Sequence, residues 1–129
     1  MKFKEMPYER IDFDEVQKEL KELMEAFDAA KSGEEQFAIH QKYYKLTGRV
    51  DSMYTIANIR FDIDTSDAFY EKEHEYYDEK MPEYSNVLLA YQKKLYESPF
   101  RDYLEKKIGP VAFKNMEIAQ KAMDEKLIP

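Results

Sequence analysis

Residues 53–82 constrain the fold of this 129-residue chain more than any other stretch. Apolar side chains at helical spacing run from Met53 to Phe61 and give way to a polar corner at residues 62–66. Within this corner and just after it, residues 64–67 offer several side-chain oxygens that can cap a new helix. A second helical pattern follows, so we expect a hairpin of two long helices around which the rest of the chain packs.

The same periodicity extends along the whole sequence and predicts an all-α fold, an elongated antiparallel bundle of about five helices. The chain contains only 3 Gly and 5 Pro, so it has few turns for its length. We expect the second helix to continue through Gly48 and the third to kink near Pro82, because proline lacks the backbone N–H. The predicted helices span residues 12–31, 34–61, 66–97, 99–108 and 110–126.

Local signals mark three of the helix starts. Asp12 with Glu15 and Ser32 with Glu35 have the spacing of a capping box. Ser98 is followed by Pro99, which we expect at the first helical position. Inward stripes are predicted to include Tyr43, Tyr44, Phe69, Tyr70, Tyr76, Tyr77, Val111, Phe113 and Met116.

Composition excludes several classes of function. A net charge of −7 argues against nucleic-acid binding, which needs an excess of Lys and Arg. With 0 cysteines, disulfides and thiolate metal sites are excluded. No apolar run approaches the roughly 20 residues that span a bilayer, and residues 1–7 show no signal-peptide core. We therefore expect a cytoplasmic protein without a membrane partner.

Helix length points to a partner. At about 1.5 Å per residue, the second and third helices would each be roughly 40 Å long, more than the diameter of a small domain. Such helices leave much of their sides uncovered, and the 11 tyrosines are rings typical of contacts between bodies. The sequence also ends in mid-segment. These features predict a piece that packs against something else.

Two patterns resemble metal sites. His74-Glu75-Tyr76-Tyr77-Asp78 is close to the His-Glu-x-x-His helix of zinc peptidases, but an Asp stands in place of the second His, so a polar helix face is the favoured interpretation. Glu71 and His74 have the Glu-x-x-His spacing of di-iron bundles. That site needs a second such pair, and His40 has Phe37 at the matching position. We predict no catalytic and no metal-binding residue here.

Other groups could recognise a ligand. The pairs Tyr43-Tyr44 and Tyr76-Tyr77 could bind a peptide, although packing between helices is the simpler use. Arg60, Asp62 and Asp64 could form a recognition site, whereas capping and a local ion pair are the simpler and favoured explanation. No Gly-rich phosphate loop or recognisable nucleophile arrangement is present.

The corner and its flanks resemble the N-terminal helical region of oligoendopeptidase F-type (thimet oligopeptidase-like) zinc metallopeptidases. The resemblance covers essentially the whole chain. It rests on residues 1–4, 8–10, 53–60, 63–65, 69–70, 73, 77–79, 82, 95–101, 104–105, 108–109 and 113.

This resemblance implies that residues 1–129 form a single helical domain, the N-terminal lobe of a longer enzyme. In that family a C-terminal part holds zinc through a His-Glu-x-x-His helix and a downstream Glu, and the N-terminal helices wall a channel that admits short peptides. The expected partners are the C-terminal catalytic domain of the same polypeptide and short peptide substrates. The lobe itself would be catalytically silent, and its substrate-binding residues stay unassigned.

Two alternatives remain open. A free-standing helical interaction module, dimerising through its aromatic stripe, would show the same composition. A bundle that binds metal through carboxylates is the other. An isolated lobe could also form a homodimer by covering surface meant for its missing half, so oligomerisation does not distinguish these hypotheses.

Overall fold

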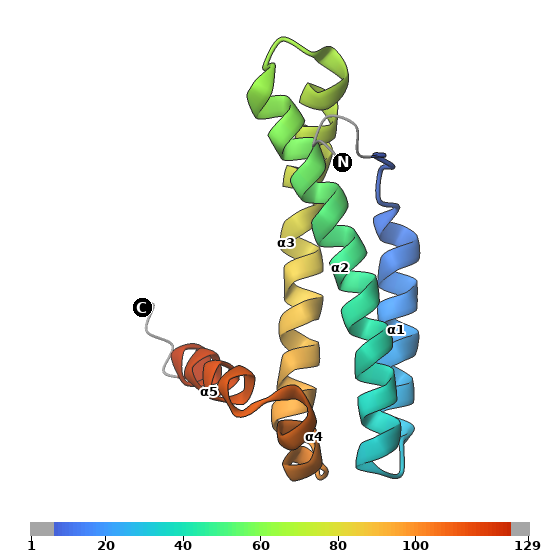
Figure 1. Ribbon diagram of the computed structural model, residues 1–129, viewed down its shortest axis with the longest axis vertical. Helices are drawn as coiled ribbons and strands as arrows, with labels where there is room; N and C mark the ends of the chain where they lie inside the picture. Colours follow the sequence, from blue (N-terminus) through green and yellow to red (C-terminus); the bar gives the residue numbers. More distant parts are fainter. Residues whose placement is uncertain (1–6, 125–129) are drawn as a thin grey trace.

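The computed structural model describes residues 7–124 and shows five α-helices (Figure 1). Their bounds are α1 Phe13–Ala29, α2 Gly33–Ile63, α3 Ala68–Tyr96, α4 Arg101–Ile108 and α5 Pro110–Asp124. The part of the chain that the structure describes contains no strand. The all-α class is therefore confirmed, and each predicted boundary in this range lies within two residues of the observed one. The predicted end of the last helix, at residue 126, lies outside the described residues.

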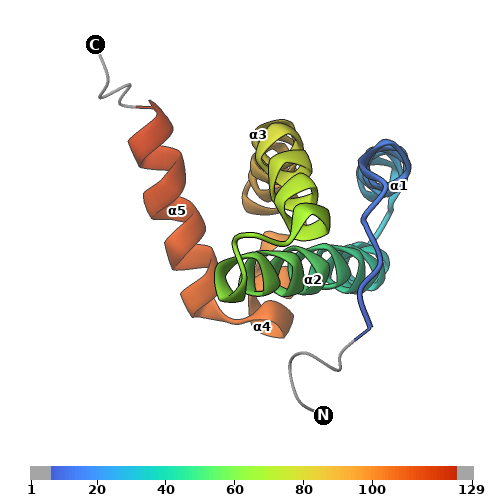
Figure 2. The same ribbon diagram turned by 90° about the horizontal axis from the view of Figure 1, so that it is seen from above.

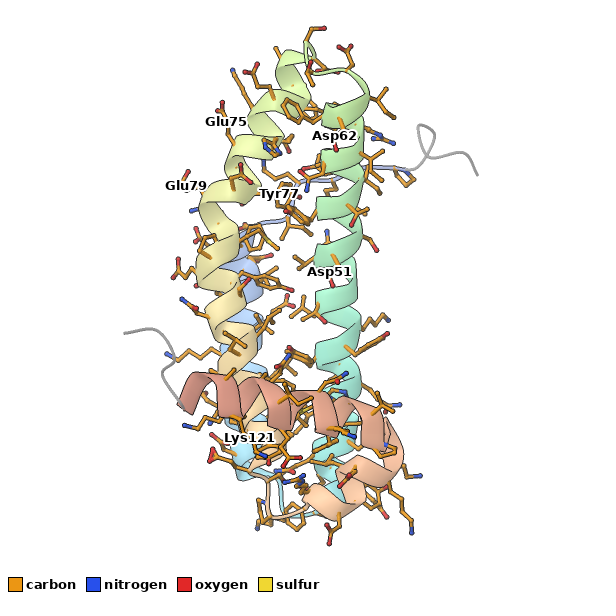
Figure 3. All side chains as sticks on the ribbon, turned by 90° about the vertical axis from the view of Figure 1, so that its left-hand side faces the viewer. Asp51, Asp62, Glu75, Tyr77, Glu79 and Lys121 are labelled. Atoms are coloured by element: carbon orange, nitrogen blue, oxygen red, sulfur yellow. The ribbon has the colours of Figure 1, made fainter. Side chains whose placement is uncertain are left out.

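α1, α2 and α3 run side by side in alternating directions and form an elongated bundle, which Figures 1 and 2 show from two sides. The short α4 lies at the end of the bundle where α3 finishes. α5 packs on α3 and α4 but runs crosswise to the bundle axis (Figure 3). The bundle proper therefore consists of three helices.

Tyrosines recur every seven residues along the inward face of α3. The series consists of Tyr70, Tyr77, Tyr84 and Tyr91. Seven residues are close to two helical turns, so these four rings lie on one side of the helix. Tyr77, Tyr84 and Tyr91 are at most 1% exposed. The rings of Phe13 and Phe27 in α1 pack against this series, with centroids 5.4 Å from Tyr84 and 5.6 Å from Tyr91 respectively. The core is consequently rich in aromatic rings.

The predicted helix caps at Asp12 and Ser32 are confirmed. Asp12 Oδ1 accepts from the backbone N–H of Asp14 at 3.1 Å, and Ser32 Oγ accepts from that of Glu35 at 3.1 Å. The Glu35 carboxylate in turn accepts from the Lys31 N–H at 2.8 Å. These bonds satisfy N–H groups that have no partner within the helix.

The corner between α2 and α3 is built by the oxygens expected there. Asp64 Oδ1 accepts from the backbone N–H of Ser66 at 3.0 Å, which closes a tight turn. Asp67 Oδ1 then accepts from the N–H of Phe69 at 2.9 Å and caps α3. The hairpin of two long helices is thus confirmed.

Gly48 and Pro82 both lie inside continuous helices. The prediction that α2 runs through Gly48 is confirmed. α3 likewise continues through Pro82, and its axis changes direction beside the labelled Glu79, in the turn before the proline (Figure 3). This is where the missing N–H and the ring of Pro82 disturb the helical hydrogen bonds.

The start of α4 differs from the prediction. Pro99 is not the first helical residue, because a turn closed by the bond from Arg101 N–H to Ser98 O, at 3.1 Å, precedes the helix. The Ser98 hydroxyl donates to Gln36 Oε1 and accepts from the Phe100 N–H at 3.0 Å. The Ser98 hydroxyl is therefore hydrogen-bonded to Gln36 and Phe100, and α4 begins only at Arg101.

Three residues assigned to inward stripes are exposed instead. Tyr44 is 73% exposed, Val111 70% and Phe69 55%. Neighbouring residues on a helix are separated by about 100°, so only one of two consecutive rings can face the core. Tyr43 takes that place beside Tyr44, and Phe113 takes it on α5, where Val111 points the opposite way.

Gly33 allows the close approach of α2 and α4. A Cβ added there would meet the Cβ and ring of Tyr103 at 2.7 Å, whereas one added at Gly48 meets nothing within 4 Å. We expect Gly33→Ala to destabilise the fold by about 1–3 kcal/mol through overpacking. The control Gly48→Ala should stabilise it by up to about 1 kcal/mol, since Ala is the better helix former. Urea denaturation followed by circular dichroism measures both, and equal effects would contradict this packing.

Candidate functional site

A groove of about 580 Å³ runs between α1 and α3. Met24 and Val87 in its wall are half-buried against the core, whereas the charged Lys21, Glu25 and Glu83 are exposed. The groove therefore combines an apolar interior with a rim that carries both signs of charge.

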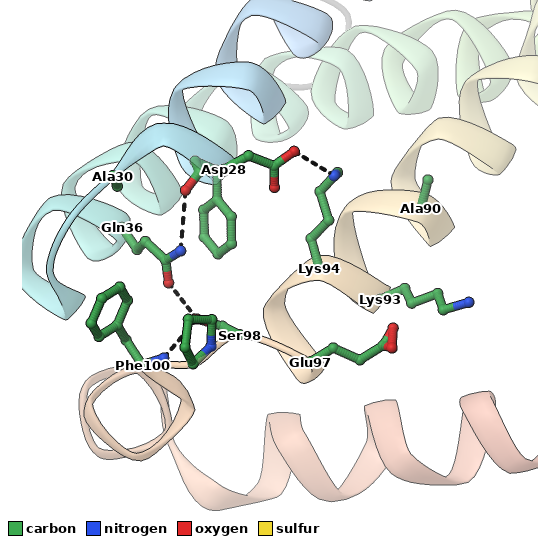
Figure 4. A pocket seen from close by; sticks show the side chains of 11 residues that line it. Asp28, Ala30, Gln36, Ala90, Lys93, Lys94, Glu97, Ser98 and Phe100 are labelled. Atoms are coloured by element: carbon green, nitrogen blue, oxygen red, sulfur yellow. Dashed lines mark hydrogen bonds and ion pairs between the residues drawn. The ribbon is translucent and has the colours of Figure 1, made fainter.

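A second hollow of about 490 Å³ continues this groove toward the α3–α4 connection (Figure 4). Asp28, Ala90 and Lys94 line both hollows. Lys94 Nζ on α3 donates to Asp28 Oδ2 on α1 at 2.7 Å, so this ion pair spans the place where the two hollows meet.

The buried amide of Gln36 joins three elements at the inner end of the second hollow (Figure 4). Its Nε2 donates to Phe27 O at the end of α1, at 3.1 Å, and its Oε1 accepts from the Ser98 hydroxyl. Because a buried polar group without a partner costs free energy, this network fixes α1, α2 and the α3–α4 connection relative to one another.

The described lining of the two hollows combines apolar and charged side chains but shows no nucleophile held by a base. Among the described residues that line the two hollows there is no histidine and no cysteine. The Ser98 hydroxyl already donates to an amide oxygen, which is not a base able to take its proton.

A second polar cluster holds the segment before α1 against α3. Glu73 is only 2% exposed, although it is charged. Arg10 Nε donates to its two carboxylate oxygens at 3.1 and 3.0 Å, Arg10 Nη2 donates to Oε2, and the Tyr8 hydroxyl donates to Oε1 at 2.6 Å. The Arg10 guanidinium also lies 4.2 Å from the ring centre of Tyr76. A buried carboxylate is thus fully paired, as its burial requires.

This pairing shifts the pKa values of the cluster. Burial acts to raise the pKa of Glu73, but the hydrogen bonds from Arg10 and Tyr8 outweigh it and leave that pKa below the ordinary value of 4.5. The pKa of the Tyr8 hydroxyl is raised by burial and by its bond to Glu73. All three groups therefore keep their ordinary charge near neutral pH, so the cluster is structural rather than a proton donor.

His40 is half-buried and packs against the core tyrosines Tyr43 and Tyr91. Its Nδ1 lies 2.9 Å from the Tyr91 hydroxyl, and its ring stacks at 5.9 Å on Tyr43. Burial lowers the pKa of His40, so the ring is neutral at neutral pH.

The residues of the two metal-like patterns do not assemble a metal site. His74 Nδ1 lies 3.0 Å from Asn58 Oδ1, and Nε2 lies 3.2 Å from Asp78 Oδ2, so both ring nitrogens have partners on the helix faces. Within residues 7–124 no group of three or more His, Cys, Asp and Glu side chains could hold a metal ion. The donors present therefore do not fit a zinc centre.

Of the remaining candidates, Tyr44 and Asp62 are exposed, and the others make contacts within the fold. Tyr77 is buried, and the half-buried Tyr76 donates its hydroxyl to Ile11 O at 2.7 Å. Arg60 Nη1 donates to the Tyr70 hydroxyl at 2.8 Å, and Asp64 shapes the corner. Packing and capping, the simpler of the two interpretations, account for these contacts.

Sequence reasoning missed the Glu73 pairing, although a signal was present. Glu73 lies three residues after Tyr70 and four before Tyr77, so it shares their inward face. A carboxylate in such a stripe requires a cation, and its partner Arg10 is 63 residues away.

Comparison with known proteins identifies the family. A model described as the Peptidase M3 N-terminal domain matches residues 3–123. The chain belongs to the peptidase M3 family. No curated protein sequence matches it.

Solved structures of the same kind align closely with this M3 domain. One is described as an oligoendopeptidase F; it shares 35% sequence identity with this chain, covers 91% of it and has a TM-score of 0.86. A structure of PZ peptidase A with an inhibitor shares 33% sequence identity, covers 90% of this chain and also has a TM-score of 0.86. A structure described as an oligoendopeptidase F from Bacillus anthracis shares 32% sequence identity, covers 91% of this chain and has a TM-score of 0.86. The chain spans only 21–22% of the length of these proteins.

The pairing of Glu73 should contribute measurably to stability. We expect Glu73→Gln to lower the free energy of unfolding by about 1–3 kcal/mol, because Arg10 loses a charged acceptor. The exposed Glu75 on the same helix provides the control, and Glu75→Gln should change the free energy by less than about 0.5 kcal/mol. Chemical denaturation at neutral pH measures both, and indistinguishable variants would refute the pairing.

The pH dependence of stability follows from the lowered pKa of Glu73. Its contribution is fully present above the unfolded pKa of about 4.5 and is lost as the pH falls through the lower folded pKa. The stability difference between the wild type and Glu73→Gln should therefore shrink below about pH 4.5. Denaturation series from neutral to acidic pH test this, and a gap that stays constant would show that the carboxylate is not ionised in the fold.

Proposed function

We propose that this chain is the N-terminal lobe of a zinc-dependent oligopeptidase that hydrolyses short peptides. The match to the Peptidase M3 N-terminal domain over residues 3–123 carries the proposal. The chain covers only 21–22% of the aligned oligoendopeptidases, which is what a lobe of such an enzyme requires. Its partner is then a C-terminal catalytic domain of the same polypeptide.

In this proposal the lobe forms one wall of the substrate channel and does no chemistry. The groove between α1 and α3 supports a binding role, because apolar Met24 and Val87 lie inside it and charged Lys21 and Glu25 lie at its rim. Peptides present backbone, apolar and charged groups together, so a surface of this mixed kind suits them.

Zinc belongs to the catalytic part in this account. The family implies the metal, but the described residues of this lobe contain no suitable donor set. No helix among them is long and apolar enough to cross a membrane. We place the enzyme in the cytoplasm.

An interaction module is the second candidate, favoured by the same groove. The groove runs along α1 and α3, so it also suits an amphipathic helix whose apolar face would lie against Met24 and Val87. This alternative needs no catalytic domain in the same polypeptide.

A peptidase assay tests the silent-lobe proposal. The purified chain, incubated with zinc and an internally quenched peptide substrate, should show no turnover above zinc alone. An intact oligoendopeptidase F assayed alongside confirms that the substrate is suitable. Turnover by the chain that a chelator abolishes would contradict the proposal, because it would require a metal site within this sequence.

A further inference from the structure

α5 carries apolar side chains on two opposite faces. Phe113 and Gln120, on the face toward α3 and α4, are 0% and 8% exposed. Val111 is 70% exposed and Ile118 59% exposed. Residues 111 and 118 are seven apart and so lie on one stripe, about 180° around the helix from residues 113 and 120.

This outward stripe differs from the outward face of α1. On α1 the exposed side is charged and includes Lys18, Glu22 and Glu25. Burying a Val or Ile side chain is favourable, so leaving two of them in water forgoes stabilisation. A helix covered on one side only, with apolar residues on the other, has the pattern of an interface.

The position of α5 leaves this stripe accessible. The helix runs crosswise to the bundle and extends beyond it (Figures 1 and 2). Lysines border one side of the stripe: Lys114 is exposed, and Lys121, whose Nζ lies 3.6 Å from Glu117 Oε1, is still 70% exposed on its side chain. A complementary surface would therefore be apolar in the middle and acidic at the edge.

The family match indicates what lies on the stripe. It ends at residue 123, next to the end of α5, and this chain covers only 21% of the aligned oligoendopeptidase F. In those proteins the remaining polypeptide is thus attached close to this helix.

We propose that the outward face of α5, built on Val111 and Ile118, is the surface on which the C-terminal part of the peptidase docks. This inference rests on the proposed function, because it takes the chain to be the lobe of a longer enzyme. The docking partner presents an apolar patch to Val111 and Ile118 and acidic groups to Lys114 and Lys121.

A chimeric enzyme tests the docking surface in a full-length protein. Residues 3–123 of this chain replace the matching segment of the oligoendopeptidase F that shares 35% identity with it. The unaltered chimera should fold and hydrolyse a fluorogenic peptide. In the double variant Val111→Glu/Ile118→Glu the activity should fall by about tenfold or more, because two carboxylates would be buried in an apolar contact. Lys121→Glu should give a smaller loss, about two- to fivefold, that added salt diminishes.

Ile63→Glu is the matched control. Ile63 is 73% exposed, like Val111, but lies at the corner at the opposite end of the bundle. Ile63→Glu should leave the activity within about twofold of that of the unaltered chimera, as expected of a change at an exposed surface position. In the 129-residue chain alone, the double variant should melt within about 2 °C of the wild type, which separates docking from folding.

The outcomes distinguish the two proposals. If the chimera is active and the double variant behaves like Ile63→Glu, the docking surface is refuted while the lobe proposal stands. If the chimera with the unaltered segment neither folds nor cleaves peptide, the lobe proposal fails and the docking inference falls with it.

Discussion

Four tyrosines spaced seven residues apart on α3 bring hydroxyl groups into the centre of the bundle, and the rest of the structure is arranged around them. A buried hydroxyl without a partner costs about 1–3 kcal/mol, so most of these hydroxyls hold a neighbouring residue in place through a hydrogen bond. Tyr77 accepts from the Ile11 N–H at 3.2 Å, and Tyr91 lies 2.9 Å from His40 Nδ1. Tyr70 accepts from Arg60. Tyr84 alone of the four has no hydrogen-bond partner for its hydroxyl among the described residues.

The polar links of this core hold α1 at both of its ends. Before α1 begins, Arg10 is tied to the buried Glu73 of α3. Where α1 ends, Gln36 joins Phe27 to Ser98. Between these fixed ends lies the groove, in which Met24 and Val87 provide apolar surface.

Local features were predictable from the sequence, and features that depend on distant residues were not. Caps such as Asp12 and Ser32 act within four residues, so their sequence signals gave the helix starts directly. The inward or outward position of Tyr44 and Val111 depends on how each helix is rotated, which the apolar pattern left ambiguous. The pairing of Arg10 with Glu73 and the α1–α3 groove arise only when elements far apart in the sequence meet, and neither was predicted.

The chain is an N-terminal domain of the peptidase M3 family, and we propose that it binds and supports rather than catalyses. Its buried carboxylate and its histidines are engaged in structural contacts, while its groove and the outer side of α5 remain open to partners. The most direct measurement of this account is the coding sequence beyond the codon for Pro129. The account predicts that the reading frame continues and encodes a His-Glu-x-x-His motif with a downstream Glu. A native stop codon directly after Pro129 would contradict it.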